Sequence, residues 1–409
     1  MTTLRMGQEY KKTPIGLIPV HWMVKRLGDL VDIQIGGTPS RNNPDYWDTA
    51  LRTENHWVAI SDMKTRVIRE TKERLTDLGI ENSNAKRIPK GTVLMSFKLT
   101  IGKVAITGAD LYTNEAIAAF LPGKEIDSGF LFYVLPMMAN MAEADVAVKG
   151  RTLNKGKLQE MLVPVPPLAE QRRIAEILNT VDEEADLLTS IIGIKTNLKR
   201  GIFEALLPRT LPRKWKSSSI GECAQINAHS VSDDTAPLKK FLYVDISSVR
   251  PFNEVATQEV MFGDAPSRAR RIVRSGDVLV STVRPYLRAF ARIKDAPDNL
   301  VASTGFAVLS PMENVDGEFL YQYVLGNRFV DFLERKMAGS NYPAVTASDV
   351  GDCPIPLPSL SEQVRIGNIL AACDAEILET RKDSFRVAAL REALVQALLR
   401  GKYARIAAE

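Results

Sequence analysis

One arrangement of charged residues in the sequence suggests metal-dependent chemistry. Asp45 precedes Asp62 and Lys64 in an order that loosely matches the P-D…(D/E)-x-K core of metal-dependent nucleases. Two carboxylates beside a lysine could hold a divalent cation and activate a water molecule. A second copy of this segment has Ser248 in place of Asp62 and Arg250 in place of Lys64. Because both copies contain the positive charge and only one contains the carboxylate, we predict no metal site and no catalytic residue here.

Other catalytic and cofactor patterns are weak or absent. The segment 43–46 (N-P-D-Y) resembles the N-P-P-Y loop of amino-methyltransferases, but its third residue is Asp and no glycine-rich donor loop precedes it. The sequence has no G-x-x-x-x-G-K-[S/T], G-x-G-x-x-G or G-x-S-x-G motif. The three histidines share no metal-ligand spacing, and Cys223, Cys353 and Cys373 form no close pair. We therefore expect no cofactor bound by this chain itself.

The composition is that of an ordinary globular protein. The 409 residues are 45% hydrophobic and 25% charged, and a chain of this length suggests two or three domains. A formal net charge of +4 permits nucleic-acid binding without requiring it. The sequence has no apolar run of membrane-spanning length, and its first residues lack the apolar core of a secretion signal. We expect a cytoplasmic protein with no membrane partner.

The clearest feature of the sequence is an internal repeat. The segment P-V-P-P-L-A-E-Q-R-R-I-A-E-I-L recurs 192 positions later as P-L-P-S-L-S-E-Q-V-R-I-G-N-I-L. Upstream, W-V-A-I-S-D-M-K (57–64) matches Y-V-D-I-S-S-V-R (243–250), and G-T-V-L-M-S-F-K (91–98) matches G-D-V-L-V-S-T-V (276–283). The chain therefore consists of two copies of one unit of about 190 residues.

Each copy begins with a mixed α/β region and ends with a long helix. Short β-branched runs broken by Gly, Pro and Asn predict a curved sheet, with short helices at 130–134 and 319–325. Residues 170–207 carry apolar residues at heptad-like spacing, interrupted by Lys195, and the second copy repeats this pattern through Leu398. Each helix needs a partner for its apolar face, and the simplest partner is the other helix.

Basic residues are concentrated in part of the second copy. Residues 268–294 contain eight Arg or Lys residues, which lie at positions 268, 270, 271, 274, 284, 288, 292 and 294, and Asp277 lies among them. The first copy has a looser counterpart at Lys86, Arg87, Lys90, Lys98 and Lys103. Such cations bind phosphates or read base edges in nucleic-acid-binding proteins, although many surface cations only face solvent.

In the order and duplication of these motifs, the chain resembles the DNA-specificity subunit of type I restriction–modification systems. The resemblance rests on I-G-G-T-P-S-R-N-N-P-D-Y-W (35–47), W-V-A-I-S-D-M, G-T-V-L-M-S and P-V-P-P-L-A-E-Q-R-R-I-A, with their counterparts in the second copy. It covers essentially the whole chain. The second copy has N-A-H-S-V-S-D-D in place of G-G-T-P-S, which puts a shared base-reading role for that loop in doubt.

The resemblance implies a non-catalytic protein that reads a bipartite, asymmetric DNA target. It implies an α/β (α+β) fold with two tandem target recognition domains and two long antiparallel, coiled-coil-like helices in pseudo-two-fold arrangement. The expected boundaries are 1–155 and 209–347 for the recognition domains, and 156–208 and 348–409 for the helical spacer regions. Implied partners are double-stranded DNA, two methyltransferase subunits and motor–nuclease subunits. S-adenosylmethionine, ATP and Mg are expected on those subunits.

Two groups of site residues follow from the repeat and the resemblance. The candidate DNA-binding residues are Arg41, Lys64, Arg66, Lys98, Lys103, Arg151, Arg250, Arg268, Arg270, Arg271, Arg274, Arg284, Tyr286, Arg288, Asn341 and Tyr342. The candidate partner-binding residues, which recur in both copies, are Glu170, Gln171, Arg173, Glu362, Gln363 and Arg365. The two glutamates could equally be first-turn residues favoured by the helix dipole.

Two other classes of function stay open at this point. The chain could be a self-sufficient DNA methyltransferase or nuclease, or a helical scaffold protein. Binding of a methyl donor by the chain alone would favour the enzyme, and salt-dependent DNA binding would exclude the scaffold.

Overall fold

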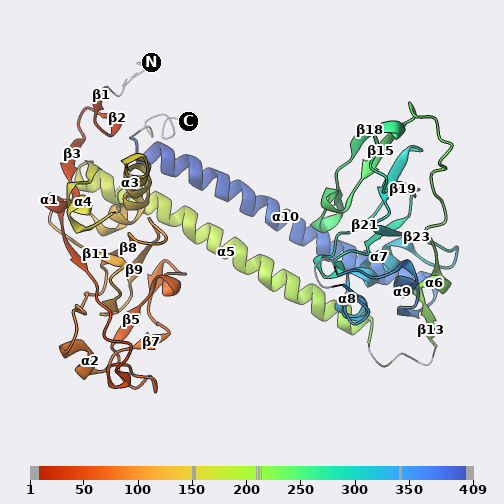
Figure 1. Cartoon of the computed structure of the whole chain (residues 1–409), viewed down its shortest axis with the longest axis horizontal. Helices are drawn as coiled ribbons and strands as arrows, with labels where there is room; N and C mark the ends of the chain where they lie inside the picture. The colour runs from red at the N-terminus through yellow and green to blue at the C-terminus, as the bar shows by residue number, and fades with distance from the viewer. Residues whose placement is uncertain are drawn as a thin grey trace, which may run out of the picture. The chain divides into compact units, whose positions relative to one another are not determined.

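The computed structural model of the chain describes residues 9–149, 153–208, 210, 212, 214–339 and 343–401. The chain divides into two compact units. Unit 1 comprises Met1–Asp186 and Arg386–Glu409, and unit 2 comprises Leu187–Phe385. Each unit contains a mixed α/β region and one end of each of two long helices, α5 and α10 (Figure 1).

The α/β region of unit 1 is built around a five-stranded sheet in the order β4-β11-β8-β9-β6. A smaller sheet has the order β10-β5-β7, and β3 pairs with β12. Its strands are β1 (Tyr10–Thr13), β2 (Gly16–Pro19), β3 (Met23–Arg26), β4 (Val31–Ile35), β5 (His56–Val58), β6 (Val67–Ile68), β7 (Glu73–Arg74), β8 (Val93–Ser96), β9 (Val104–Thr107), β10 (Tyr112–Thr113), β11 (Ile117–Pro122) and β12 (Leu162–Val165). Its helices before α5 are α1 (Leu27–Leu30), α2 (Asp77–Glu81), α3 (Ser128–Lys149) and α4 (Lys155–Glu160).

Unit 2 repeats this arrangement with two four-stranded sheets, β14-β23-β20-β21 and β18-β15-β22-β19, and the pair β13-β24. Its strands are β13 (Lys216–Ser219), β14 (Ala224–Ile226), β15 (Lys240–Val244), β16 (Val249–Arg250), β17 (Glu254–Val255), β18 (Gln258–Met261), β19 (Ala269–Ile272), β20 (Val278–Ser281), β21 (Phe290–Arg292), β22 (Leu300–Ser303), β23 (Phe306–Pro311) and β24 (Pro354–Leu357). Its short helices are α6 (Ile220–Cys223), α7 (Gly317–Leu325), α8 (Asn327–Glu334) and α9 (Ala347–Gly351).

The two units share sheet topology as well as sequence. In unit 1, β11 lies antiparallel between β4 and β8, and in unit 2 β23 lies antiparallel between β14 and β20. The repeat also extends to a parallel pairing, β5 with β10 in unit 1 and β15 with β22 in unit 2. The predicted duplication and mixed α/β fold are therefore confirmed, and the short helices predicted at 130–134 and 319–325 lie within α3 and α7.

The long helices α5 (Leu168–Leu206) and α10 (Leu360–Leu398) match the two predicted helices closely. Both follow a proline-rich segment, which favours extended backbone before the helix. In unit 1 the side chains of Ile174 and Leu178 are buried, as are those of Ile366 and Leu370 in unit 2. None of the helices formed by the described residues is long and apolar enough to cross a membrane.

Within each unit, α5 and α10 are joined by ion pairs, one of them in unit 1 and two in unit 2 among the described residues. In unit 1 the Arg391 Nε lies 2.5 Å from the Asp182 carboxylate. In unit 2 the Lys199 Nζ lies 2.6 Å from the Asp374 carboxylate, and the Lys195 Nζ lies 3.0 Å from that of Glu376. As the residue number increases along α5, the number of its partner on α10 decreases. The two helices therefore run antiparallel. Lys195 interrupts the heptad-like apolar pattern in the sequence, but its side chain contributes to the contact between α5 and α10.

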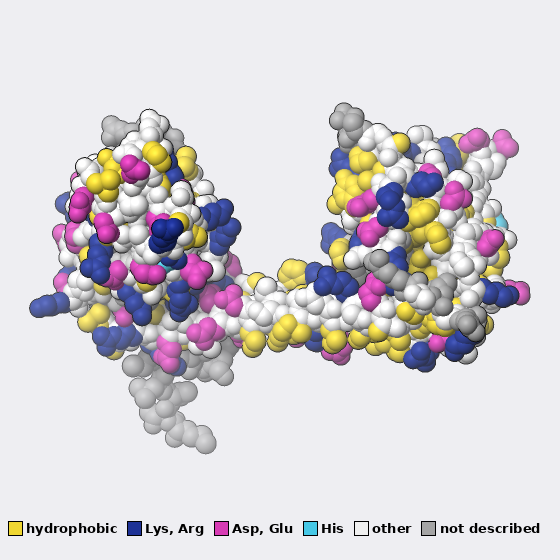
Figure 2. All heavy atoms as spheres, turned by 90° about the horizontal axis from the view of Figure 1, so that it is seen from below, with side chains coloured by type: hydrophobic (Ala, Val, Ile, Leu, Met, Phe, Trp, Pro, Cys, Tyr) yellow, Lys and Arg dark blue, Asp and Glu magenta, His cyan; other side chains and the backbone are white. Residues whose placement is uncertain are grey.

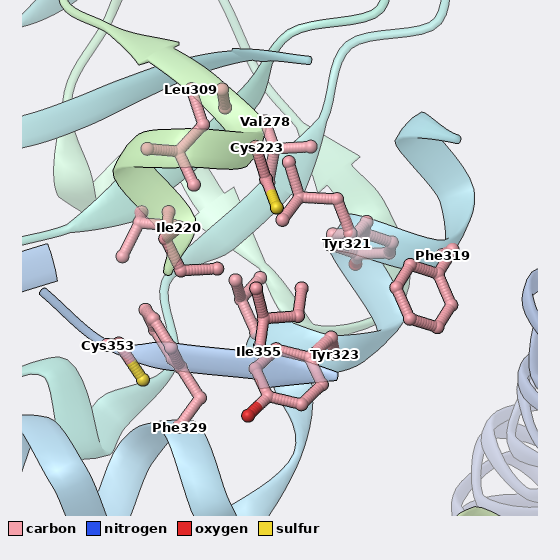
Figure 3. Close-up of a cluster of buried hydrophobic side chains, with 14 of the residues drawn as sticks. Ile220, Cys223, Val278, Leu309, Phe319, Tyr321, Tyr323, Phe329, Cys353 and Ile355 are labelled. Carbon is pink, nitrogen blue, oxygen red and sulfur yellow. The ribbon is translucent and has the colours of Figure 1, made fainter. Parts of the chain in front are cut away.

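The core of unit 2 packs the sheet against α6, α7 and α8 (Figure 3). Phe319, Phe329 and Ile355 are almost wholly inaccessible to solvent. The Cys223 and Cys353 thiols lie in the same core. Burial raises the pKa of Cys353 to about 12 and also raises the pKa of Cys223.

These thiols are expected to resist alkylation in the native chain. The thiolate is the reactive form, and burial limits both thiolate formation and access of the reagent. Cys373, on α10, is partly exposed. We expect a maleimide at pH 7 to modify Cys373 alone in the native chain and all three cysteines after denaturation. Mass spectrometry of the labelled peptides checks this, and rapid native labelling of Cys353 would show that the core opens readily.

Candidate nucleic-acid interface

Of the two acidic residues that suggested a metal site, Asp62 holds a short helical turn, and Asp45 lies in a different turn, Pro44–Tyr46. The Asp62 carboxylate accepts a hydrogen bond from the Ala59 backbone N–H at 2.9 Å. In unit 2 the Asp245 carboxylate accepts one from the Ser248 N–H, also at 2.9 Å. The two carboxylates therefore stabilise equivalent short helical turns, Ile60–Asp62 in unit 1 and Ile246–Ser248 in unit 2. Asp62 lies at the end of its turn, and Asp245 lies at the start of the other. Among the described residues, no group of three His, Cys, Asp or Glu side chains could hold a metal ion.

A basic residue follows this turn in both units. Lys64 and Arg250 are exposed, and the Arg250 guanidinium lies 3.5 Å from the Glu254 carboxylate, itself exposed. An exposed ion pair of this kind is weak, so it leaves the cation available to another anion. The repeat therefore presents a positive charge at the same place in both units.

Arg41 is positioned by two aromatic side chains. Its guanidinium lies 3.7 Å from the ring centroid of Trp47 and 4.9 Å from that of Trp57. It also forms an ion pair with Glu73, and half of its side chain is exposed. An arginine fixed on aromatic rings loses little side-chain entropy on binding a phosphate or base edge.

Three other basic candidates of unit 1 differ in exposure. Lys98 is exposed just after β8. The Lys103 Nζ donates to the Ile60 carbonyl at 3.2 Å. The Arg66 guanidinium donates to the Tyr133 hydroxyl at 2.7 Å and also bonds Asn179. Lys103 and Arg66 are thus used inside unit 1, which leaves Lys98 as the cation most accessible to DNA among these three.

The four arginines at 268–274 in unit 2 also differ in how accessible their side chains are. Arg268 and Arg274, on either side of β19, are exposed. Arg270 lies over the Phe262 ring at 5.2 Å and 3.6 Å from the Asp233 carboxylate. Arg271 is partly buried and bonds the Ser230 hydroxyl at 3.4 Å. The side chains of Arg268 and Arg274 are therefore the more accessible of the four.

The loop at 284–288 has a strained backbone. Arg284 and Arg288 both adopt left-handed conformations, with φ of 48° and 53°, around a short helical turn. Non-glycine residues rarely adopt this conformation except where the surrounding structure imposes it. Arg288 donates to the Leu325 carbonyl and the Asn327 side chain, while Tyr286 is exposed. The candidates Arg151, Asn341 and Tyr342 lie outside the described residues.

The Glu-Gln pairs at the helix starts are used within their own units. Gln171 is fully buried, accepts from the Asp127 N–H at 2.8 Å, and donates to the carbonyls of Glu125 and Pro166 at 2.9 Å. Gln363 is equally buried and makes the matching set of bonds to Asp316, Asn314 and Pro358. These amides attach the α/β region to its long helix.

The adjacent glutamates bind a tryptophan in each unit. The Trp22 Nε1 donates to Glu170 at 2.9 Å, and the Trp215 Nε1 donates to Glu362 at 3.3 Å. Of the partner-binding candidates, only Arg173 and Arg365 have largely exposed side chains, at 68% and 58%. This role was not predicted, although the tryptophan recurs in the sequence, in P-V-H-W (19–22) and in P-R-K-W (212–215).

The interhelical ion pairs were also missed. The repeat offset of 192 relates Asp182 to Asp374 and Lys199 to Arg391, so it exchanges one pair for the other. The hydrogen bond from Arg391 to Asp182 raises the pKa of the arginine, which stays charged. The signal was present as a cation and an anion that each recur 192 positions later.

A family model described as the type I restriction modification DNA specificity domain matches residues 19–196 and again residues 212–384. The chain belongs to this family. The MjaIX type I restriction enzyme specificity subunit of Methanocaldococcus jannaschii is 22% identical over 443 residues, covering 98% of each chain. The two copies of the specificity domain correspond to the duplication seen in the sequence and in the sheets.

Solved structures share the fold of this specificity-family chain. The S subunit of a type I restriction–modification system from M. genitalium superposes with a TM-score of 0.58 and 17% identity, covering 92% of this chain and 96% of that one. A chain from a type I R-M system studied for its complex assembly and conformational transition gives 0.57 and 20%, covering 94% and 99%.

Membership of the specificity family decides between the classes left open by the sequence. The chain is a DNA-recognition subunit without catalysis of its own, and the alternative of a self-sufficient methyltransferase or nuclease is not supported.

Proposed function

We propose that each unit reads one half of a split, asymmetric DNA target. The observation that carries the proposal is the duplicated scaffold with an exposed cation, Lys64 or Arg250, at the same turn of both copies. Phosphate contacts fix a protein on the duplex, and different side chains on equivalent surfaces then read different bases. The accessible basic candidates are Arg41, Lys64, Lys98, Arg250, Arg268 and Arg274. The recognition domains would span 1–155 and 209–347.

The helical regions, 156–208 and 348–409, would space the recognition domains and bind two methyltransferase subunits. Leu187, Ile194 and Leu198 are 59–66% exposed on α5, and their spacing places them on one helical face. Figure 2 shows such hydrophobic side chains exposed along the helices. An exposed apolar face of this kind favours a helical partner. Arg173 and Arg365 add exposed charge at the start of each helix.

The reactions would then belong to partner subunits. Methyltransferase subunits would bring S-adenosylmethionine, and motor–nuclease subunits would bring ATP and Mg. The candidate DNA surface of this chain supplies arginine and lysine side chains, which suit recognition rather than group transfer.

The DNA surface is tested by reversing two exposed charges, Arg268→Glu with Arg274→Glu. If both residues contact phosphates, affinity for a random-sequence duplex should fall at least about tenfold at 0.1 M salt, and the slope of log K against log salt should flatten by about 1.8. Fluorescence anisotropy of a labelled duplex across a salt series measures both quantities.

The matched control is Lys216→Glu with Lys382→Glu, which changes the net charge equally at two other exposed positions of unit 2. The control variant should reduce DNA binding far less, because it changes the net charge of the protein without removing a phosphate contact. Equal losses in the two double variants would mean that net charge, and not this surface, governs binding. Unchanged affinity and slope in the first variant would place the DNA elsewhere.

A further inference from the structure

Unit 2 contains a cleft of about 460 Å³. Its walls come from the end of α5, the middle of α10, α7, and the loops at 251–252 and 287–288. The volume falls in the range typical of small-molecule sites. All of its lining residues belong to unit 2.

The repeat shows which side chains unit 1 has at equivalent positions. In unit 1, Arg66 and Tyr133 meet the Asp182 carboxylate, with the Tyr133 hydroxyl 2.7 Å and the Arg66 guanidinium 3.6 Å from it. The repeat offsets of 186 and 189 that hold around these positions put Phe252 at Arg66 and Gln322 at Tyr133.

The carboxylate itself is common to both units. It is Asp374 in unit 2, where Lys199 bonds one oxygen at 2.6 Å and Gln322 the other at 2.9 Å. Unit 2 therefore has Phe252 and Gln322 in place of a guanidinium and a phenol, and it keeps their acidic partner.

Two polar atoms of the cleft-lining residues are buried without a hydrogen-bond partner among the residues that the structure describes. The Gln322 side chain is 2% exposed, and its Oε1 accepts no bond although its Nε2 donates two. The Arg381 Nε donates none, while its guanidinium lies 4.7 Å from the Phe252 ring centroid. An unpaired buried polar group destabilises the folded chain, so a ligand that pairs both atoms would recover that free energy.

The charge and shape of the walls restrict the ligand. The charged lining residues are the cations Lys199, Arg200, Arg288 and Arg381 and the acids Glu204 and Asp374. Both acids already have cationic partners, Arg328 and Lys199. The excess of positive charge therefore favours an anion.

Aromatic side chains complete the cleft. Phe203, Phe252 and Tyr321 line it and offer flat apolar surface to a planar group. Two wall residues, Phe252 and Arg288, have left-handed backbones with φ of 64° and 53°. Strained backbone of this kind concentrates at ligand sites.

We propose that this cleft binds a nucleotide, with its base among the aromatic residues and its phosphate near Arg200 and Arg381. A base carries a ring N–H or amino group that can donate to the Gln322 Oε1. Its phosphate accepts from arginine in a charge-assisted hydrogen bond. The nucleotide is either free in solution or part of a DNA strand, and both present the same chemistry to the cleft.

Isothermal titration of the purified full chain with AMP, adenosine and inorganic phosphate, in EDTA, tests the proposal. AMP should bind at least about tenfold more tightly than adenosine or phosphate alone, since each lacks one half of the contacts. A short single-stranded oligonucleotide, titrated in parallel, distinguishes a nucleotide within a strand from a free one.

The variant Phe252→Arg with Gln322→Tyr rebuilds the side chains of unit 1 in the cleft. It should abolish binding, and Arg381→Ala should weaken binding at least about tenfold, the loss expected for a charge-assisted bond. Lys382→Ala is the matched control, because this exposed neighbour on α10 pairs only with Glu379 among the described residues and does not line the cleft.

Loss of AMP binding in the filled variant supports a free nucleotide, and loss of oligonucleotide binding alone supports a nucleotide within a strand. If neither AMP nor the oligonucleotide binds at millimolar concentration, the proposal is overturned. So does phosphate binding as tightly as AMP, which would reveal a simple anion site. Binding that survives both the filled variant and Arg381→Ala would place the ligand elsewhere and also overturn it.

Discussion

Replacing Gln171 with alanine is expected to destabilise unit 1 by about 3–5 kcal/mol, because three buried backbone groups lose their hydrogen-bond partner together. The amide lies within 3 Å of the Asp127 N–H and of the Glu125 and Pro166 carbonyls. No water replaces it easily, since the side chain is 0% exposed. The carbonyls and the N–H belong to the segments that enter α3 and α5, so their attachment should loosen first.

Hydrogen exchange measured by mass spectrometry resolves where the stability is lost. Gln171→Ala should speed exchange throughout the α/β region of unit 1, and Gln363→Ala should do the same in unit 2. Gln171→Glu is a sharper test because it preserves the shape of the side chain. Its carboxylate oxygens cannot donate, and one of them would face two carbonyl oxygens.

Arg173→Ala serves as the control, two positions further along the same helix and largely exposed. It should change stability by less than about 0.5 kcal/mol, as is usual for surface positions. A loss below 1 kcal/mol in Gln171→Ala would show that the amide does not join the α/β region to the helix.

The sequence was sufficient to predict the architecture because the repeat is carried by local patterns. Heptad-like spacing predicted a helix at 170–207, and α5 spans Leu168–Leu206. It also predicted that the second helix extends to Leu398, where α10 ends. Short β-branched runs predicted strands such as β8 and β20. Each of these patterns depends on neighbours in the sequence, and the second copy confirms the first.

The roles of single side chains could not be predicted in this way. Gln171 and Arg66 look like surface residues in the sequence, and both are used inside unit 1. Whether a polar residue is buried depends on contacts with residues 44–113 positions away, such as Asn179 for Arg66. The cleft in unit 2 is lined by residues from segments far apart in the chain, such as Phe252, Gln322 and Arg381, so the sequence alone could not bring them together.

Lengthening both long helices by four residues is expected to change the DNA spacer and not the bases read. The insertions are placed after Ser190 on α5 and after Lys382 on α10, which are 192 positions apart and so equivalent in the repeat. Each site leaves Asp182–Arg391 on one side and Lys199–Asp374 on the other. Both ion pairs can therefore form in the lengthened chain.

Four residues add about 6 Å and slightly more than one turn to a helix, so the apolar faces stay nearly in phase. Base pairs are about 3.4 Å apart along DNA, so the preferred spacer between half-sites should lengthen by one or two base pairs. Selection from a library of duplexes with different half-site separations measures this preference. Neither α/β region is altered, so the selected half-sites should match those of the unaltered chain.

Insertion into α5 alone is the control, since it moves Asp182 and Lys199 apart while their partners on α10 stay at their original separation. One of the two ion pairs must then break, and the chain should bind DNA poorly or lose stability. Two-residue insertions in both helices rotate the apolar faces by about 200° and should prevent the helices from packing. A chain with four residues added to each helix that folds, binds DNA and selects the original spacer would show that α5 and α10 do not set the distance between the half-sites.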